Sequence, residues 1–243
     1  MVRSVMPSPF LVLDIETVLD PELPIAESSE AERLPAPPHH MVVVIGALWL
    51  DPSGEPKRLG VIGEGKDERG VLCDFVRLVS ERRPCLVTYN GRGFDLPVIT
   101  SRCLRHGIPF RHYFAARDVR YRFSPEGHLD LMDYVADFGA AKPSKLDVVA
   151  KLSGMPGKVG VDGKDVGPMV HAGRLDEVRN YCLCDVAQTA AVFLRVQLLR
   201  GELDPDAYGR VMGRLIATIR GDERVAAVAG SMNEDRLLLR EGS

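Results

Sequence analysis

The sequence predicts an α/β domain with a mixed five-stranded sheet flanked by helices. Five short apolar segments have the length and composition of strands, and longer segments with apolar residues at i, i+3 and i+4 alternate with them. The hydrophobic fraction of 45% in 243 residues is enough for one sizeable core. We therefore expect one domain over residues 9–200, followed by a helical extension and tail over 201–243.

Composition excludes several classes of protein. The formal charge of −3 argues against strong binding to duplex nucleic acid through overall positive charge. No apolar run reaches 18 residues, and the apolar stretch at the N-terminus is too short for a signal peptide, so a soluble, cytoplasmic protein is expected. The five cysteines lack paired CxxC spacing, which favours reduced core thiols over a zinc site.

The first predicted strand, residues 10–17, carries acidic residues at its carboxyl end. Side chains alternate along a strand, so Asp14 and Glu16 share one face while Leu13 and Ile15 point to the other. Two carboxylates held together beside a hydrophobic sheet repel each other, and a divalent cation between them relieves that repulsion. The alternative is a strand that runs out into solvent, where the two acids have no joint role.

The next two strands are predicted over residues 41–50 and 57–62. The turn-forming segment 51–56 between them is short, so these strands should form an antiparallel hairpin. The connection before them, residues 20–40, contains five prolines and leaves directly from the acidic strand end. It should therefore border any site at that end.

A helix over residues 68–80 and a strand over 85–89 come next, and a loop with two glycines leads from that strand into a helix ending at Gly107. This arrangement places Asp95 beside a strand end, where open α/β sheets usually bind their ligands. Asp95 can equally serve only as the N-cap of the helix that begins there.

The segments that follow give weaker signals. Residues 118–123 are compatible with a strand or a loop, and residues 128–133 with a fifth strand that passes into a helix reaching Phe138. A further helix should start with Ser144 as its cap and end at Gly154. The glycine-rich loop 154–164 suits a phosphate or a plain turn, but it lacks the spacing of a Walker A motif.

The longest helical pattern covers residues 174–200. Within it, Tyr181 and Asp185 are four residues apart and lie on one face next to the apolar stripe, so Asp185 should be partly buried and needs a partner. Alone, Tyr181 can also be an ordinary core tyrosine. A last amphipathic helix is expected over 204–219, and the tail beyond Gly230 should be marginally ordered.

In this order, these segments resemble the DEDD superfamily of 3′–5′ exonucleases, in the branch with a tyrosine four residues before the last aspartate. The chain is most similar to predicted exonucleases related to the proofreading domain of family B DNA polymerases. The histidine of the other branch would stand at Asn180. The matching segments are LDIET at 13–17, YNGRGFD at 89–95, HLDLMD at 128–133 and YCLCDV at 181–186.

The resemblance implies a ribonuclease H-like fold in which strands one to three are antiparallel and the last two are parallel to the first. It also implies two divalent cations, Mg²⁺ or Mn²⁺, with Asp14 bridging both, Glu16 and Asp185 completing one site, and Asp95 supporting the other. Tyr181 would orient the attacking water in a two-metal hydrolysis that releases nucleoside 5′-monophosphates.

Further residues are implied as contacts to the nucleic acid. Asn90 can instead serve only the tight loop, Phe94 can be core or stack on a terminal base, and each basic residue can be a solvated surface charge. His128 and Asp130 are expected to be structural more often than catalytic. The candidate contacts are Thr17, Asn90, Phe94, Arg92, Lys158, Lys142, Lys145 and Lys164.

The expected activity is 3′–5′ hydrolysis of single-stranded ends, with DNA preferred over RNA because of the polymerase resemblance. An exoribonuclease and a non-catalytic nucleic-acid-binding module are the alternatives. We expect any role in DNA repair or proofreading to involve a polymerase or repair protein in trans, because few residues follow position 200.

Overall fold

The computed structural model describes residues 8–23, 34–160 and 162–240. Its centre is a five-stranded sheet in the order β3-β2-β1-β4-β5. Strands β1, β2 and β3 are antiparallel, whereas β4 and β5 run parallel to β1. The predicted ribonuclease H-like sheet is therefore confirmed. The strands are β1 (Phe10–Leu19), β2 (His40–Leu50), β3 (Pro56–Val61), β4 (Cys85–Thr88) and β5 (His128–Asp130).

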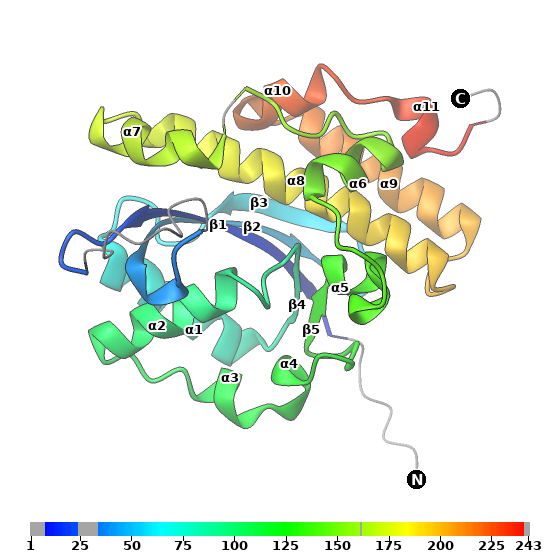
Figure 1. The fold of residues 1–243 in the computed structure, drawn as a ribbon. Helices are drawn as coiled ribbons and strands as arrows, with labels where there is room; N and C mark the ends of the chain where they lie inside the picture. Colours follow the sequence, from blue (N-terminus) through cyan, green and yellow to red (C-terminus); the bar gives the residue numbers. More distant parts are fainter. Residues whose placement is uncertain (1–7, 24–33, 161, 241–243) are drawn as a thin grey trace, which may run out of the picture.

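Helices cover both faces of the sheet (Figure 1). On one face lies α8 (Leu175–Leu199), backed by α6 (Leu146–Ser153) and α9 (Pro205–Arg220). On the other lie α1 (Glu68–Arg82) and α2 (Asp95–His106). The shorter helices are α3 (Arg111–Ala115), α4 (Arg117–Arg120), α5 (Leu131–Val135), α7 (Val166–His171), α10 (Ala226–Ala229) and α11 (Glu234–Leu237), with 3-10 turns at Pro37–His39, Asp137–Gly139, Gly163–Asp165 and Glu223–Val225.

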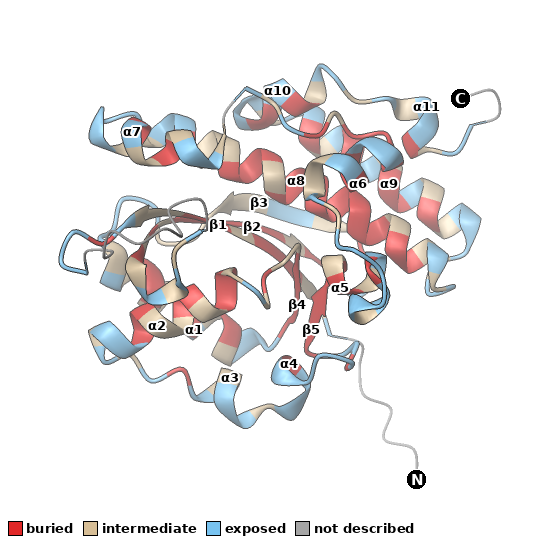
Figure 2. Cartoon of the chain, viewed as in Figure 1, coloured by how far each residue is buried: buried red, intermediate tan, exposed pale blue. Residues whose placement is uncertain are grey.

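The alternation of side chains along β1 divides the core between these faces. Val12 packs with the α8 side, whereas Leu11, Leu13 and Ile15 pack with α1 and α2. Figure 2 shows β4, β5 and most of α8 as buried. Asp14 and Glu16 lie two and four residues after Val12, so their side chains point to the same face of the sheet, the one that α8 covers.

Helix α8 is long and apolar enough to cross a membrane by length and composition. However, 78% of its most apolar 18-residue stretch is buried inside the protein. Its hydrophobicity is therefore explained by its place between the sheet and α9, as in the core helix of a globular domain.

The C-terminal extension packs into the same core as the rest of the chain. Residues Val211, Met212 and Leu215 of α9 lie in the cluster formed with α8, and the Tyr208 hydroxyl donates a hydrogen bond of 2.6 Å to the Leu237 carbonyl. The expectation of a marginally ordered tail beyond Gly230 is wrong through residue 240, because α11 closes over this core.

Two local predictions are also wrong. Residues 118–123 form neither a strand nor a plain loop, because α4 and the turn after it occupy this segment. Ser144 does not cap α6, which begins after Lys145 without a side-chain cap, and the Ser144 carbonyl instead accepts a bond from the Tyr89 hydroxyl. Gly154 ends α6 with φ 105° as predicted.

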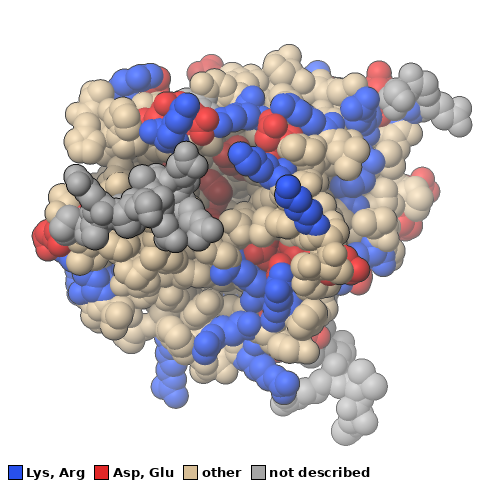
Figure 3. All heavy atoms as spheres, in the orientation of Figure 1, with Lys and Arg blue, Asp and Glu red and all other residues tan. Residues whose placement is uncertain are grey.

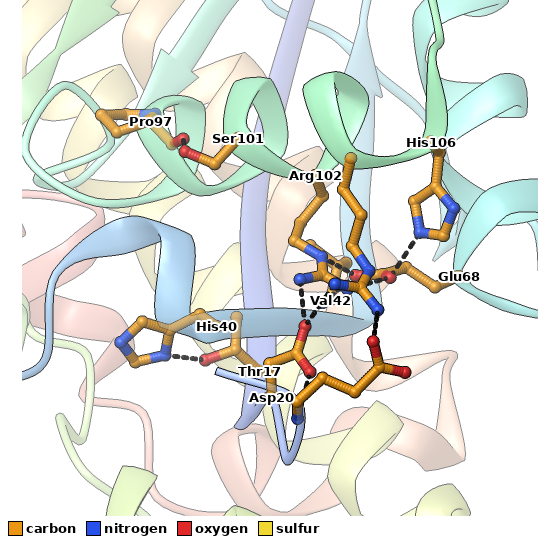
Figure 4. A network of polar contacts seen from close by, with 11 residues as sticks. Thr17, Asp20, His40, Val42, Glu68, Pro97, Ser101, Arg102 and His106 are labelled. Carbon is orange, nitrogen blue, oxygen red and sulfur yellow. Dashed lines mark hydrogen bonds and ion pairs between the residues drawn. The ribbon is translucent and has the colours of Figure 1, made fainter. Parts of the chain in front are cut away.

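A buried ion network fixes the end of β1 to α1 and α2 (Figure 4). The guanidinium of Arg102, with its side chain 1% exposed, donates to Asp20 at 2.6 Å and to Glu68 at 2.7 Å. Glu68 also accepts from the Val42 amide and contacts His106. This set, here called the Arg102 network, positions the strand end from which the candidate site is built.

Candidate active site

Strand β1 presents Asp14 and Glu16 beneath α8. Asp14 pairs in register with Gly46 of β2, and a bulge follows Glu16. A Cβ on Gly46 would lie 2.8 Å from the Cys182 sulfur, so glycine at this position allows α8 to pack directly on the sheet. This close packing brings residues of α8 to the acidic pair.

Helix α8 contributes Tyr181, Cys182 and Asp185 to the same place. The Cys182 thiol lies 3.6 Å from Oδ2 of Asp14 and donates to the Asp14 carbonyl at 3.4 Å. Tyr181 lies one turn before Asp185 on the helix, close enough for its hydroxyl to lower the pKa of that carboxyl. The Gln188 amide donates to Asp185, at 3.3 Å. Tyr181 and Asp185 lie four residues apart on α8, as the sequence predicts, and the partner that Asp185 needs is supplied at least by Gln188.

The loop between β4 and α2 delivers Asp95. Asp95 is the first residue of α2 rather than its N-cap, which is Phe94, and the nearby backbone of Ile15 in β1 favours its ionised carboxylate. Asn90 adopts φ 67°, and Gly91 passes so close to Thr88 that a Cβ would lie 2.4 Å from the threonine hydroxyl. This tight turn places Asp95, 4% exposed, against the acidic strand.

Asp130 holds that loop from β5. Its carboxylate accepts from the amides of Asn90 at 2.7 Å and Arg92 at 2.9 Å, and it also caps α5. His128 is buried and its Nε2 is hydrogen bonded to the Thr88 hydroxyl at 2.8 Å. Both residues thus have the structural positions that the sequence favours for them.

Burial and neighbouring acids raise the pKa of Asp14 and Glu16. Burial raises the pKa of Asp14 well above its ordinary value, and the charges of Asp95, Glu16 and Asp185 raise it further. Burial and the charges of Asp185 and Asp95 do the same to Glu16. The four carboxylates therefore lie within electrostatic reach of one another, although they come from β1, α2 and α8.

Asp95 and Asp185 titrate in the neutral range. Burial raises the pKa of Asp95 to about 7, with a further contribution from Asp130. Burial also raises the pKa of Asp185 to about 6, against the lowering by Tyr181, Gln188 and the charge of Lys158. The burial of Tyr181 and the neighbouring carboxylates raise its pKa, so this tyrosine stays protonated.

The donor set fits a hard divalent cation. Oxygen atoms of Asp14 and Glu16 and the sulfur of Cys182 lie within 4.8 Å of one another, and Asp95 and Asp185 add two more carboxylates. Among the described residues, no ion pair joins any of these four acids to Lys, Arg or His. Carboxylate oxygens are the ligands that Mg²⁺ and Mn²⁺ prefer. Figure 3 shows acidic atoms at the floor of a recess with basic side chains on its rim.

The predicted nucleic-acid contacts lie in different surroundings. The Thr17 hydroxyl is hydrogen bonded at 3.0 Å to His40, whose ring meets Phe94 edge-on at 4.9 Å. Lys158 follows α6 in the glycine-rich loop, its charge acts on Asp185, and its amine pairs with Asp162 at 2.5 Å. Thr17 follows Glu16 and Phe94 precedes Asp95, so these two residues, with Lys158, border the acidic site.

The guanidinium of Arg92 is directed to backbone carbonyls of the protein. Its guanidinium donates to the carbonyls of Val119, Arg120, Tyr121 and His128, the last at 2.8 Å, and its side chain is 17% exposed. It ties the loop before Asp95 to the segment after α3. We therefore treat Arg92 as a structural residue.

Sequence reasoning missed three side chains next to the acids. Cys182 and Gln188 each lie three residues from Asp185, a helical spacing that was available as a signal. His40, which is 4% exposed, begins β2 directly after the proline-rich connection. Only this place in the chain distinguishes it in the sequence.

Comparisons with known proteins agree with this geometry. Residues 33–230 match the family described as a predicted 3′–5′ exonuclease related to the exonuclease domain of PolB. The matched range includes Asp95, Tyr181 and Asp185, whereas Asp14 and Glu16 precede it.

Two curated relatives are DNA polymerases. The chain is 28% identical over 130 residues to a DNA polymerase of Archaeoglobus fulgidus, covering 51% of this chain and 17% of that protein. It is 32% identical over 118 residues to DNA polymerase 1 of Aeropyrum pernix, covering 42% of this chain and 11% of that protein. The chain thus spans less than a fifth of the length of either relative.

Solved structures of exonuclease I are also similar. A product-bound exonuclease I aligns with a TM-score of 0.43 and 15% identity over 76% of this chain and 46% of that one. The zinc-bound form of an E. coli ExoI–ssDNA complex aligns with a TM-score of 0.37 and 14% identity over 76% and 43%.

The family match covers most of the chain, and it contains the loop and helix that bring Asp95, Tyr181 and Asp185 to the acidic strand. The expectation of a 3′–5′ exonuclease, a hydrolase of phosphodiester bonds, is confirmed at the level of this family. The chain belongs to the predicted 3′–5′ exonucleases related to the exonuclease domain of PolB.

Proposed function

We propose that this protein removes nucleotides from the 3′ end of single-stranded DNA in a reaction that depends on Mg²⁺ or Mn²⁺ and releases nucleoside 5′-monophosphates. The observation that carries the proposal is the convergence of acidic side chains from three separate elements: ligand atoms of Asp14, Glu16 and the α8 residue Cys182 lie within 4.8 Å of one another, and the charges of Asp95 and Asp185 act on both Asp14 and Glu16. Such a group of acids is electrostatically unfavourable unless cations occupy it.

Asp14, Glu16, Asp95 and Asp185 would hold the cations. When bound, two divalent ions supply acidity to the attacking water and stabilise the leaving 3′ oxygen. The acids hold the ions in place only while ionised, so protons compete with the ions for these carboxylates, and burial raises the pKa of Asp95 and Asp185 in the metal-free site.

Tyr181 has a different role in the proposal. Because its pKa is raised, its hydroxyl remains a hydrogen-bond donor throughout the working pH range. Tyr181 lies four residues before Asp185 on α8, and it lowers the pKa of that carboxyl. We assign Tyr181 to orienting the carboxylate and, with substrate present, the attacking water.

The choice of DNA follows from the relatives, which are DNA polymerases. The fold alone does not discriminate, since selection against RNA requires a contact to the 2′-hydroxyl. Lys158, beside Asp185 on an exposed loop, is the basic residue best placed for the terminal phosphates.

The test is a time course on 5′-labelled single-stranded DNA and RNA of one sequence, with Mn²⁺, Mg²⁺ or EDTA. We expect a ladder that shortens from the 3′ end on DNA with either metal, and no products in EDTA. Equal degradation of RNA would move the proposal to an exoribonuclease. Immediate release of the labelled 5′ nucleotide, which indicates hydrolysis from the 5′ end, would overturn it. Equal rates of hydrolysis with and without EDTA would do the same.

A further inference from the structure

A band of exposed aromatic rings and arginines lies beside the loop that presents Asp95. It is formed by α3, α4, the turn after α4, and the segment from α5 to Gly139. The chain carries a net charge of −3, yet residues 111–123 contain four arginines and a single acid. We call this band the aromatic–arginine surface; its members are Phe114, Arg117, Arg120, Tyr121, Phe123, Tyr134 and Phe138.

Four of its rings form a continuous series, Tyr121, Phe123, Phe138 and Tyr134, the last two of which are partly buried. Centroids are 5.8 Å apart for Tyr121 and Phe123, 4.9 Å for Phe123 and Phe138, and 5.2 Å for Phe138 and Tyr134. Tyr121 and Phe123 are 48% and 56% exposed. Large aromatic side chains left in water in a contiguous group usually mark a binding surface rather than a core.

The backbone holds one of these rings at a cost in free energy. Asp137 and Phe138 adopt φ of 45° and 53°, in the left-handed region that non-glycine residues rarely occupy. Such a conformation is unfavourable, and surroundings that over-determine it must offset its cost. The turn keeps Phe138 between Phe123 and Tyr134.

The arginines on this surface stack on rings and keep their charge available. Arg117 lies 5.6 Å above the Tyr121 ring, and Arg120 lies 5.3 Å above Phe114. Neither forms an ion pair with a described acidic residue, and both are exposed. Figure 3 shows basic side chains below the acidic recess, over α3 and α4, on the same face of the molecule.

This surface is joined to the active site by direct contacts. Arg92, from the loop before Asp95, donates to the carbonyls of Arg120 and Tyr121. A hollow of about 370 Å³ beside the same loop is lined by Tyr89, Asn90, Met132 and Lys145, among others. Met132 belongs to α5, the helix that also carries Tyr134, so the hollow adjoins both the loop before Asp95 and this helix.

We propose that the aromatic–arginine surface binds the single strand upstream of the nucleotide being removed. Exposed rings stack on bases of any sequence, and arginines bind the phosphates between them, which is how non-specific single-strand sites are usually built. The proposal rests on the proposed function for the direction of the strand, but strand binding itself does not require hydrolysis.

The experiment measures binding of labelled single-stranded DNA by fluorescence anisotropy at several salt concentrations, in an Asp14→Asn background that prevents degradation. Oligonucleotides of about 4 and about 16 nucleotides bracket the usual site sizes. The variants are Arg117→Gln with Arg120→Gln, and Phe123→Ala. The matched control is Arg58→Gln with Arg210→Gln, two exposed arginines on β3 and α9.

We expect the long strand to bind more tightly than the short one, and the Arg117 and Arg120 variant to lose most of that advantage. Two lost phosphate contacts should reduce the slope of log K against log salt by about 1.4. Phe123→Ala should weaken binding of the long strand by at least about fivefold, whereas the control should match the parent protein.

Equal affinity and equal salt slope in the Arg117 and Arg120 variant and the control would overturn the proposal. Far-ultraviolet circular dichroism and the melting temperature show whether each variant is folded. If the wild-type protein binds long strands through these arginines but releases no nucleotides, the surface is correct and the proposed reaction is not.

Discussion

Two groups of buried carboxylates lie on the same pair of elements, and they differ in what neutralises them. In the Arg102 network, Asp20 follows β1 and meets Arg102 of α2. In the active site, the charge of Asp95 at the start of α2 acts on Asp14 of β1. The first group contains its own cation. The second, among the described residues, forms no ion pair.

The pKa values follow this difference in opposite directions. Burial opposes ionisation of Asp20 and Glu68, but hydrogen bonds from Arg102 outweigh it and lower the pKa of both carboxyls. Burial and like charges raise the pKa of Asp14 and Glu16. The same fold can clearly supply an arginine to a buried acid, so its absence from the active site indicates a site built for an external cation.

The largest expected effect is on activity, from Asp14→Asn or Asp185→Asn. Each change removes a cation ligand, so we expect the hydrolysis rate to fall by about 10³-fold or more. The melting temperature in EDTA should stay equal or rise, because a repelling charge is lost. A wild-type rate in either variant would show that the acids are not the catalytic centre.

The corresponding change in the Arg102 network, Arg102→Leu, should lower the free energy of unfolding. Removing one partner of a buried ion pair typically costs about 3–5 kcal/mol, because the acids are left buried and unpaired. Urea unfolding monitored by circular dichroism measures this loss. Arg105→Gln, at the exposed edge of the network, is the control and should change little. A stable Arg102→Leu protein would mean that Asp20 and Glu68 need no internal cation.

These two regions also differ in how far the sequence predicts them. Asp14, Glu16, Tyr181 and Asp185 follow from local periodicity, since strand alternation and helical spacing fix which side chains share a face. The Arg102 network joins residues 82 and 34 positions apart, and nothing in local patterning singles out Arg102 among the arginines.

The wrong local predictions have a similar cause. The segment 118–123 is fixed by Arg92 and by packing of its rings, contacts made with distant residues, so its short helix left no periodic signal. Ser144 had an available cap position, but its carbonyl is bound by Tyr89 and the helix starts later. Tertiary contacts override local preference at both places.

The two regions should respond oppositely to pH. Because the pKa of Asp95 is raised to about 7 and that of Asp185 to about 6, the folded metal-free protein retains protons that the unfolded chain has lost. Stability in EDTA should therefore fall as pH rises from about 4 to about 7. The lowered pKa of Asp20 and Glu68 acts in the other direction: their contribution is present above the ordinary carboxyl range and is lost as pH falls below it.

Metal should reverse only the first of these trends. Mn²⁺ competes with protons for the acids, so it should raise the melting temperature more at pH 8 than at pH 5. At 100 times its dissociation constant, one bound ion stabilises by about 2.7 kcal/mol. Asp14→Asn should abolish the shift, and Arg105→Gln should keep it. An equal Mn²⁺ shift at both pH values would contradict the assignment of the raised pKa values.

The smallest expected effect comes from Tyr181→Phe, and it separates a positioning role from a structural one. Loss of one hydrogen bond to a charged group should slow hydrolysis by about tenfold. The Mn²⁺ melting shift should remain, because no ligand is removed. The hydroxyl lowers the pKa of Asp185 in the wild-type protein, so its loss should move the acidic limb of the pH–rate profile to higher pH.

Tyr89→Phe is the matched control for that variant, since its hydroxyl binds the Ser144 carbonyl outside the acid cluster. It should leave the acidic limb in place, whatever it does to stability. If Tyr181→Phe also leaves the limb and the rate unchanged, the tyrosine only fills space beside α8. If the acidic limb of the pH–rate profile moves while Mn²⁺ still raises the melting temperature, Tyr181 acts on the ionisation of Asp185. Asp185 is the one acid of the four whose carboxylate has a neutral donor on the same helical face.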